Sequence, residues 1–229
     1  MNSFPPVWWT PDAETDGDVE ARVAVLVDEL LQQRGAFMDK TWQAGPMIDG
    51  KVKGADKRPV SMPHKPDHVI GEVTESAPAD IETALESARR GYEAWSAEDV
   101  TARADVLRKV ADLYETHTPE FCALLALEAG KTLPDCIAEI REAVDFLRYY
   151  AMQAEAVPEL KARGVFTCIS PWNFPLAIFT GQISAALALG NAVLAKPAET
   201  TTLIAARAVE LFHEAGRPAA ALQLLRGQG

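Results

Sequence analysis

The chain has 229 residues, with 33 acidic and 22 basic side chains and a formal net charge of −11. This acidic balance argues against nucleic acid as a partner, because its phosphates would be repelled. No stretch is long and apolar enough to span a membrane, and the N-terminal residues lack the pattern of a secretory signal. Three cysteines without framework spacing and four scattered histidines predict a reducing, cytoplasmic compartment and no metal site.

The first part of the chain predicts a leader, a helix and an extended arm. Residues 1–40 combine a proline- and tryptophan-containing leader with a helix from about Val19 to Arg34, which we expect to end at Gly35. Residues 47–63 mix short extended runs with glycine and proline, which predicts a β arm.

Helices with one apolar face follow. One begins near Pro78, and its expected core-facing residues are Ile81, Leu85, Ala88, Tyr92 and Trp95. Another is expected to begin at Thr118 as the N-cap and to end at Gly130.

A long helix is predicted from about Pro134 to Ala154, with an apolar stripe along one side. The charged run from Glu139 to Asp145 admits two interpretations. It could form a carboxylate site, but pairs of opposite sign within the helix favour a solvated face. Residues 155–164 then lead to the next element.

A strand signal meets a stiff bend at residues 165–175. The run 165–169 is short, apolar and β-branched, which is typical of a strand buried on both faces. Pro171 and Pro175 fix the backbone of the bend that follows. Between them, Asn173 offers N–H donors without a charge, and such a donor can stabilise a developing oxyanion. The alternative is that Asn173 satisfies its own turn.

The remaining residues predict helix 176–189, strand 192–195, helix 200–215 and strand 221–225. Together with the strand at 165–169 they predict a right-handed parallel α/β unit, whose ligands lie at the carboxyl ends of its strands. Asn173 and Lys196 both follow such ends. For Lys196 and Glu199, the alternative is a pair of charges that merely begins the next helix.

Two motifs in this region resemble the aldehyde dehydrogenase family. They are CISPWNFPLAIFTGQ at 168–182 and GNAVLAKPAE at 190–199. Within the family, the first motif and the helix AEIREAVDFLRYYA at 138–151 are most similar to the L-glutamate γ-semialdehyde dehydrogenase module of bacterial proline-utilisation proteins.

The resemblance implies an α/β chain that forms the N-terminal portion of an aldehyde dehydrogenase fold, with a helical scaffold and a truncated parallel Rossmann-like sheet. Residues 41–229 would form an incomplete NAD-binding domain, with an oligomerisation arm near 155–164. The implied reaction is the NAD-dependent oxidation of L-glutamate γ-semialdehyde to glutamate in proline catabolism. We expect a homo-oligomer and no flavin.

The family's chemistry assigns roles to residues of the two bends. In this family a cysteine thiolate attacks the aldehyde, hydride passes to NAD, and a glutamate activates water. By resemblance, Asn173 donates to the oxyanion and Phe174 flanks the aliphatic part of the substrate. The positions implied to bind the cofactor are Ile169, Ser170, Pro171, Trp172, Lys196, Ala198 and Glu199. Glu199 favours NAD over NADP, because a carboxylate accepts hydrogen bonds from ribose hydroxyls and repels a 2′-phosphate.

None of the three cysteines is expected to be the nucleophile. Cys122 and Cys136 lie in helical patterns, and Cys168 lies inside a strand. The 229 residues are therefore expected to be inactive alone. The alternative function is a non-catalytic remnant that binds nucleotide or pairs with a full subunit, or a dehydrogenase for another aldehyde. A sheet that stops after three strands would expose an edge, which predicts poor solubility.

Overall fold

The computed structural model describes residues 16–54, 56–216 and 219–227, with side chains from residue 27 onward. The predicted leader at Pro5 to Pro11 lies outside the described residues. The helices are α1 (Asp16–Met38), α2 (Pro78–Ser96), α3 (Val100–Thr116), α4 (Thr118–Ala129), α5 (Leu133–Ala156), α6 (Ala177–Ala188) and α7 (Thr202–Glu214). The strands are β1 (Trp42–Ala44), β2 (Met47–Ile48), β3 (Lys51–Val52), β4 (Lys57–Met62), β5 (Lys65–Thr74), β6 (Val165–Ile169), β7 (Ala192–Lys196) and β8 (Leu222–Leu224). This content confirms the predicted α/β class.

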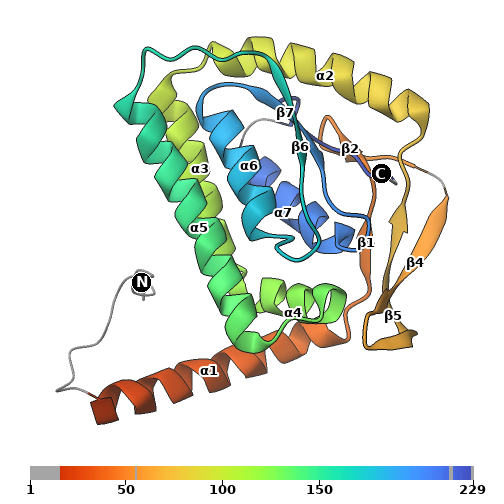
Figure 1. The fold of residues 1–229 in the computed structure, drawn as a ribbon, viewed down its shortest axis with the longest axis vertical. Coiled ribbons are helices and arrows are strands. Elements are labelled where there is room, and N and C mark those ends of the chain that lie inside the picture. The colour runs from red at the N-terminus through yellow and green to blue at the C-terminus, as the bar shows by residue number, and fades with distance from the viewer. Residues whose placement is uncertain (1–15, 55, 217–218, 228–229) are drawn as a thin grey trace.

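The predicted strand–helix unit supplies β6, β7 and β8 of a five-stranded sheet (Figure 1). The strand order is β3-β2-β8-β7-β6, and β6, β7 and β8 run parallel. Helix α6 connects β6 to β7, and α7 connects β7 to β8. The carboxyl ends of these strands therefore meet at one edge of the sheet, where ligands bind in such folds.

The expectation that the third strand ends the sheet was wrong. β2 pairs antiparallel with β8, with Met47 opposite Leu224, and β3 pairs with β2. Met47 and Ile48 are both buried. β2 therefore pairs with the edge of β8 that we expected to be open. Because β2 is antiparallel to β8, the sheet is mixed.

The two edge strands of the sheet are β3 and β6, and β6 is the longer. The sequence predicts that β6 is buried on both faces, but Cys168 is its one buried residue. Phe166 and Ile169 are 44% and 63% exposed. The prediction was wrong because β6 ends the strand order and has a neighbour on one side within the described residues.

We expect this edge to make the purified chain poorly soluble, because unpaired backbone groups beside exposed apolar side chains favour edge-to-edge association. Light scattering and sedimentation of the isolated chain measure this. A monodisperse monomer that melts cooperatively would contradict the expectation.

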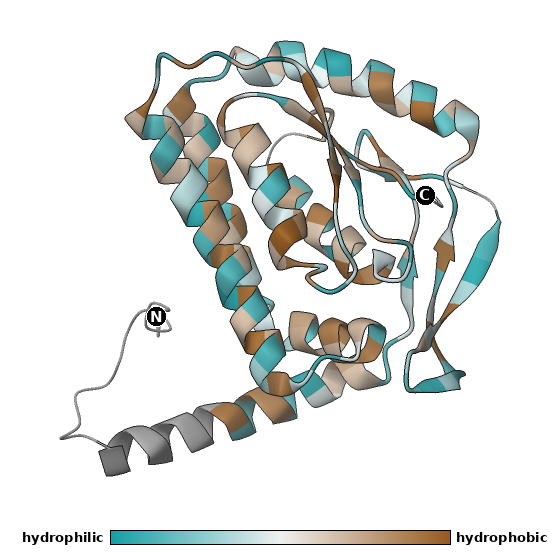
Figure 2. Ribbon diagram, viewed as in Figure 1, coloured by the Kyte–Doolittle hydropathy of each residue, from teal (hydrophilic) through white to brown (hydrophobic). Residues whose placement is uncertain are grey.

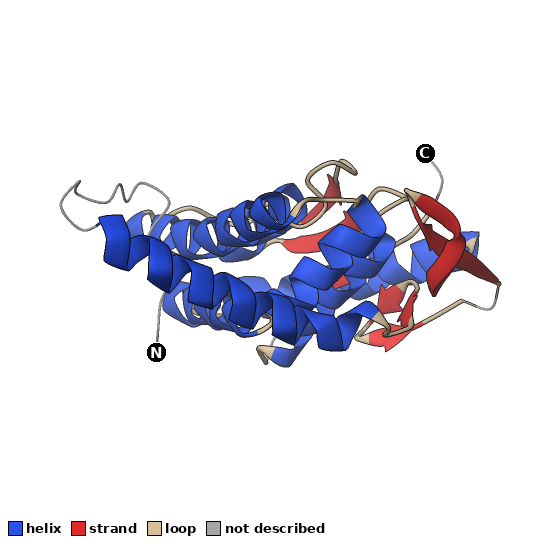
Figure 3. Cartoon of the chain, turned by 90° about the horizontal axis from the view of Figure 1, so that it is seen from below, coloured by secondary structure: helices blue, strands red, loops and turns tan. Residues whose placement is uncertain are grey.

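The predicted β arm divides between two sheets. β2 and β3 belong to the five-stranded sheet, whereas β4 pairs with β5 in a separate three-stranded sheet of order β1-β5-β4. In Figure 3 the strands lie in the half of the molecule away from the N-terminal end of α1. Local sequence predicted extended structure correctly there, but it could not assign each strand to its partner.

Helix α1 continues through Gly35 to Met38, so the predicted end at Gly35 was wrong. Phe37 and Met38 pack against the core, and this burial outweighs the cost of a helical glycine, about 1 kcal/mol. Thr118 does not act as the N-cap of α4, which is His117. The Thr118 hydroxyl instead donates to the carbonyl of Glu115 at 2.8 Å.

Helix α2 packs on the sheet through small residues. Ile81 is 48% exposed, so the predicted apolar stripe was wrong at its first position. The buried residues of α2 are Ala84, Ser87, Ala88, Gly91 and Trp95. A side chain at Gly91 would overlap the backbone of Ala220 and Ala221, which explains why small residues occupy this face.

We expect Gly91→Ala to destabilise the fold by about 1–3 kcal/mol, because the added methyl group must push the segment before β8 away. Gly35→Ala is the matched control. Gly35 also lies in a helix, and a methyl group there meets no atom within 4 Å. That variant should gain about 0.4–1 kcal/mol. Urea unfolding of both variants measures the difference, and equal midpoints would refute the packing argument.

The core continues from the sheet into the helices. Figure 2 shows apolar residues along β6, β7 and α6, and alternating polar and apolar positions along α3 and α5. Tyr114, Phe121 and Phe212 meet edge to face between α3, α4 and α7. Among the described helices, none combines the length and apolar character needed to cross a membrane.

Candidate active site

Two bends at the carboxyl ends of β6 and β7 lie beside each other. Ile169 is opposite Lys196 in the parallel register, and the Ser170 amide donates to the Lys196 carbonyl at 3.1 Å. The first bend then runs from Pro171 to Pro175. The second runs from Lys196 through Glu199. The fold thus brings together the two motifs that the sequence singled out.

Asn173 lies exposed on the first bend. Its side chain makes no hydrogen bond to any residue that the structure describes, so the interpretation that it satisfies its own turn finds no support. Trp172 and Phe174 flank it and are 62% and 39% exposed. The carboxamide therefore keeps its N–H donors available to a ligand.

The start of this bend is fastened to α6. Ser170 is buried, and its hydroxyl donates to the Gln182 side-chain oxygen at 3.3 Å. The Gln182 amide donates in turn to the Ile169 carbonyl at 3.2 Å. Of the positions predicted to contact the cofactor, Ser170 faces the protein, whereas Ile169 and Trp172 are exposed.

The end of the bend is held by Glu139 of α5, which is 2% exposed. Its Oε1 accepts hydrogen bonds from the amides of Leu176 and Ala177 at 2.8 and 3.2 Å. The expectation of a solvated face was wrong at this position. Helical periodicity identifies neighbours along α5, but it cannot show that one turn of α5 faces the start of α6.

A lysine completes this arrangement. Lys131 Nζ lies 2.5 Å from Glu139 Oε2 and 4.6 Å from the centre of the Phe174 ring. Its side chain is 15% exposed. The cation thus joins the buried carboxylate to the residue next to Asn173.

The second bend has a similar support. Thr201, at the N-cap of α7, makes no side-chain capping bond. The buried Glu128 of α4 accepts instead from the amides of Leu203 and Ile204 at 2.7 and 2.9 Å. Burial raises the pKa of Glu128 to about 7, although its bonds to the amides oppose that shift.

Arg226, which follows β8, ties the second bend to Glu75 after β5. Its side chain is fully buried, donates to Thr202 Oγ1 at 3.1 Å and to the Glu199 carbonyl at 3.3 Å, and pairs with Glu75. Sequence reasoning missed the roles of Glu128, Glu139 and Arg226. A signal existed for Glu128, which is a lone acid in the apolar run 121–129.

The second bend carries two charged side chains, one exposed and one half-buried. The Glu199 carboxylate is exposed and accepts no hydrogen bond from the described residues, and Lys196 lies half-buried at the end of β7. They lie at the carboxyl end of a parallel strand, and a carboxylate there can accept hydrogen bonds from hydroxyl groups. Ala198 lies between them and is half-buried.

The cysteines do not supply a thiolate at the bends. Cys122, Cys136 and Cys168 are all buried. Burial raises the pKa of the Cys168 thiol to about 11, which keeps it protonated at neutral pH. Within the described chain, no group of acidic residues, cysteines and histidines is arranged to hold a metal ion.

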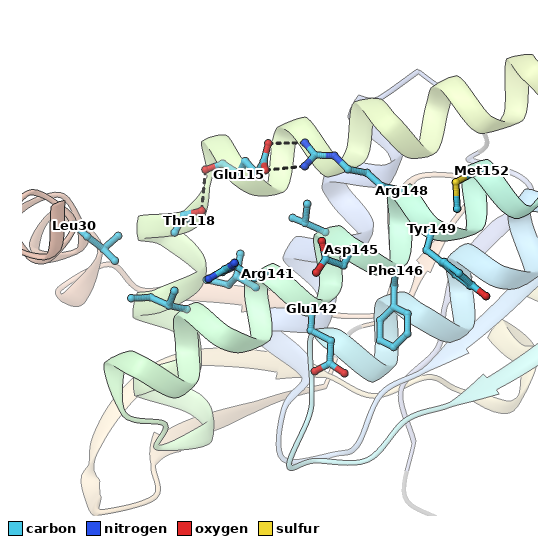
Figure 4. Close-up of a pocket in the computed structure, with 13 residues that line it drawn as sticks. Leu30, Glu115, Thr118, Arg141, Glu142, Asp145, Phe146, Arg148, Tyr149 and Met152 are labelled. Carbon is cyan, nitrogen blue, oxygen red and sulfur yellow. Dashed lines mark hydrogen bonds and ion pairs between the residues drawn. The ribbon is translucent and has the colours of Figure 1, made fainter. Parts of the chain in front are cut away.

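A groove of about 700 Å³ runs along α5 and is separate from the predicted site residues. Figure 4 shows that Leu30, Thr118 and residues of α5 line it, and that Arg148 reaches Glu115 across it. The Arg148–Glu115 ion pair measures 2.7 Å. Asn173, Lys196 and Glu199 are not among its lining residues.

Comparison with known proteins agrees with this geometry. Residues 51–229 match the aldehyde dehydrogenase family, to which the chain therefore belongs. Its relatives include bifunctional protein PutA from Escherichia coli, which is 49% identical over 92% of this chain and 16% of the PutA chain. Another is 1-pyrroline-5-carboxylate dehydrogenase from Bacillus cytotoxicus, which is 34% identical over 94% of this chain and 44% of that enzyme.

A solved structure of 1-pyrroline-5-carboxylate dehydrogenase from Thermus with bound NAD has a similar fold. It matches 100% of this chain and 46% of its own length, with 32% identity and a TM-score of 0.81. The chain thus spans less than half the length of these relatives, and it matches the N-terminal part of the aldehyde dehydrogenase fold.

Proposed function

We propose that the chain serves in the NAD-dependent oxidation of L-glutamate γ-semialdehyde to glutamate, a step of proline catabolism. The relatives named 1-pyrroline-5-carboxylate dehydrogenase and PutA support this substrate. The family itself makes the protein an oxidoreductase. The cytoplasm suits it, because all three cysteines are free thiols.

The observation that carries the proposal is the Asn173 carboxamide beside the Lys196–Glu199 bend. It is exposed and makes no hydrogen bond to the described residues. An oxyanion that forms at a carbonyl carbon is stabilised by a fixed donor of this kind. Phe174 offers an apolar surface next to it for the aliphatic part of a substrate. The two bends thus supply adjacent places for an aldehyde and a nucleotide.

NAD fits the second bend better than NADP. The Glu199 carboxylate would accept hydrogen bonds from ribose hydroxyls, whereas a 2′-phosphate would meet its negative charge. Lys196 would contact the same ribose, and Ile169 to Trp172 would line the path toward Asn173. When bound, NAD accepts the hydride that leaves the substrate.

The thiolate and the water-activating glutamate of the family are proposed to come from residues other than these 229. Because the buried cysteines cannot reach Asn173 as thiolates, the chain alone should bind nucleotide without turnover. We propose that the complete enzyme is a homo-oligomer and that residues 155–164 form its arm. The alternative is a remnant that binds only nucleotide.

Two measurements test the proposal. Calorimetric titration of the purified chain should show binding of NAD and weaker binding of NADP. The complete coding sequence should produce NADH with L-glutamate γ-semialdehyde, and a higher kcat/KM for it than for short unsubstituted aldehydes. NAD binding without any aldehyde oxidation would favour the remnant, and equal kcat/KM values would overturn the substrate.

A further inference from the structure

The first bend has no local support at its end. Helix α6 begins directly after it, and Leu176 at the N-cap provides no side-chain acceptor. A serine, threonine, aspartate or asparagine at this position would cap the helix itself. Leu176 is instead fully buried, so the free amides at the start of α6 need an acceptor from elsewhere.

Glu139 supplies that acceptor from α5, 37 residues earlier in the chain. One carboxylate oxygen takes both amide bonds, and the other faces Lys131. The amides belong to Leu176 and Ala177, and Leu176 is the third residue after Asn173. Pro175 lies between Asn173 and these amides and stiffens the connection.

Lys131 adds a second contact on the same bend. Its ammonium lies over the Phe174 ring, in the geometry of a cation–π interaction. The side chain before Phe174 is Asn173. The Lys131–Glu139 pair therefore touches the bend at the ring of Phe174 and at the backbone that follows Pro175.

We propose that Glu139, through Lys131 and the two amides, is a positioning residue that fixes the direction of the Asn173 carboxamide. The inference rests on the proposed function for its catalytic consequence. Glu139 does not contact the substrate in this arrangement. It holds the bend so that the oxyanion donor already points correctly before the reaction, which avoids reorganisation in the transition state.

The chain contains a matched control in Glu128. This residue is also buried, also lies on a helix behind the sheet, and also accepts two amide bonds at the start of a helix. Glu128 supports the second bend, which contains Lys196 and Glu199, whereas Asn173 lies on the first bend. Glu139→Gln and Glu128→Gln thus make the same isosteric replacement in the supports of the two bends.

The first experiment follows the side-chain amide signal of Asn173 by NMR in the complete enzyme labelled at asparagine, with hydrogen exchange of the backbone amides. Glu139→Gln and Lys131→Met should both shift the Asn173 signal, and Glu139→Gln should speed exchange at Leu176 and Ala177. Glu128→Gln should speed exchange at Leu203 and Ile204 and leave the Asn173 signal in place. An unmoved Asn173 signal in Glu139→Gln would overturn the proposal.

The second experiment measures NADH formation by the complete enzyme. Glu139→Gln should lower kcat by about a hundredfold, because a small misplacement of a catalytic group has an effect of that size. The KM for NAD should stay within a factor of about two. The double variant with Lys131→Met should lose no more than either single variant, because both changes release the same bend.

Leu147→Ala tests whether a loss of stability alone could explain the lower kcat of Glu139→Gln. Leu147 is fully buried on the same helix, and its truncation should lower the urea midpoint of unfolding without changing a residue of the bend. That variant should keep the wild-type kcat, and an equal loss of kcat would overturn the positioning role. Failure of the wild-type enzyme to oxidise any aldehyde would overturn the proposed function, whereas the NMR measurement judges the position of Asn173 independently.

Discussion

Replacing Asn173 with alanine is expected to lower the kcat for aldehyde oxidation by about a hundredfold or more, the usual effect of losing one oxyanion donor. Asn173 is exposed and makes no hydrogen bond to the described residues, so its removal should change the free energy of unfolding by less than about 0.5 kcal/mol. NAD affinity should also stay unchanged, because the ribose groups belong to the second bend. Steady-state kinetics and calorimetry on the complete enzyme measure these quantities.

Asn173→Asp is the sharper comparison, since it keeps the size of the side chain. It replaces the N–H donors with a carboxylate, which repels a developing oxyanion. We therefore expect a larger loss of kcat than for Asn173→Ala. A wild-type kcat in either variant would remove Asn173 from the proposed mechanism.

The second large effect is a pH dependence caused by Glu128. Its pKa is about 7 in the folded chain and is taken as 4.5 without burial. Between these values the folded state binds a proton that the unfolded state has lost, so the free energy of unfolding falls as pH rises. The whole contribution is about 3 kcal/mol, and it is present below pH 4.5 and lost above pH 7.

Glu128→Gln isolates this contribution, because the amide does not titrate. Other groups act in the opposite direction: burial lowers the pKa of His213, so its contribution to stability increases as pH rises toward 6.5. The difference between wild type and Glu128→Gln in urea unfolding cancels such groups. It should fall by about 3 kcal/mol across the window. Parallel curves would show that Glu128 is ionised throughout, as an ordinary capping carboxylate.

The two glutamates show why the support of the site was hidden from sequence analysis. Glu139 lies in a charged run in which other residues, such as Arg141 and Asp145, have the spacing of an ion pair within a helix. The pattern therefore favoured a solvated face. Its true partners, the amides of Leu176 and Ala177, belong to a helix that becomes a neighbour only when α5 packs on α6.

Strand pairing also shows what local sequence predicts and what packing decides. The apolar run 165–169 predicts a strand correctly, but its exposure depends on its place at the end of the sheet. β2 has two residues, too few for any periodic signal, yet it covers β8. Met47 of β2 and Leu224 of β8 are far apart in sequence, but they pair in the sheet and both are buried.

The amino-acid sequence by itself determined the class of fold, the strand–bend–helix order and the two bends that carry Asn173 and Glu199. These features follow from local rules: prolines fix backbone angles, and apolar periodicity selects helix or strand. Tertiary structure decided which carboxylates are buried, which strand forms the open edge, and how the bends are held. Those outcomes depend on contacts between distant segments, whose partners no local pattern specifies.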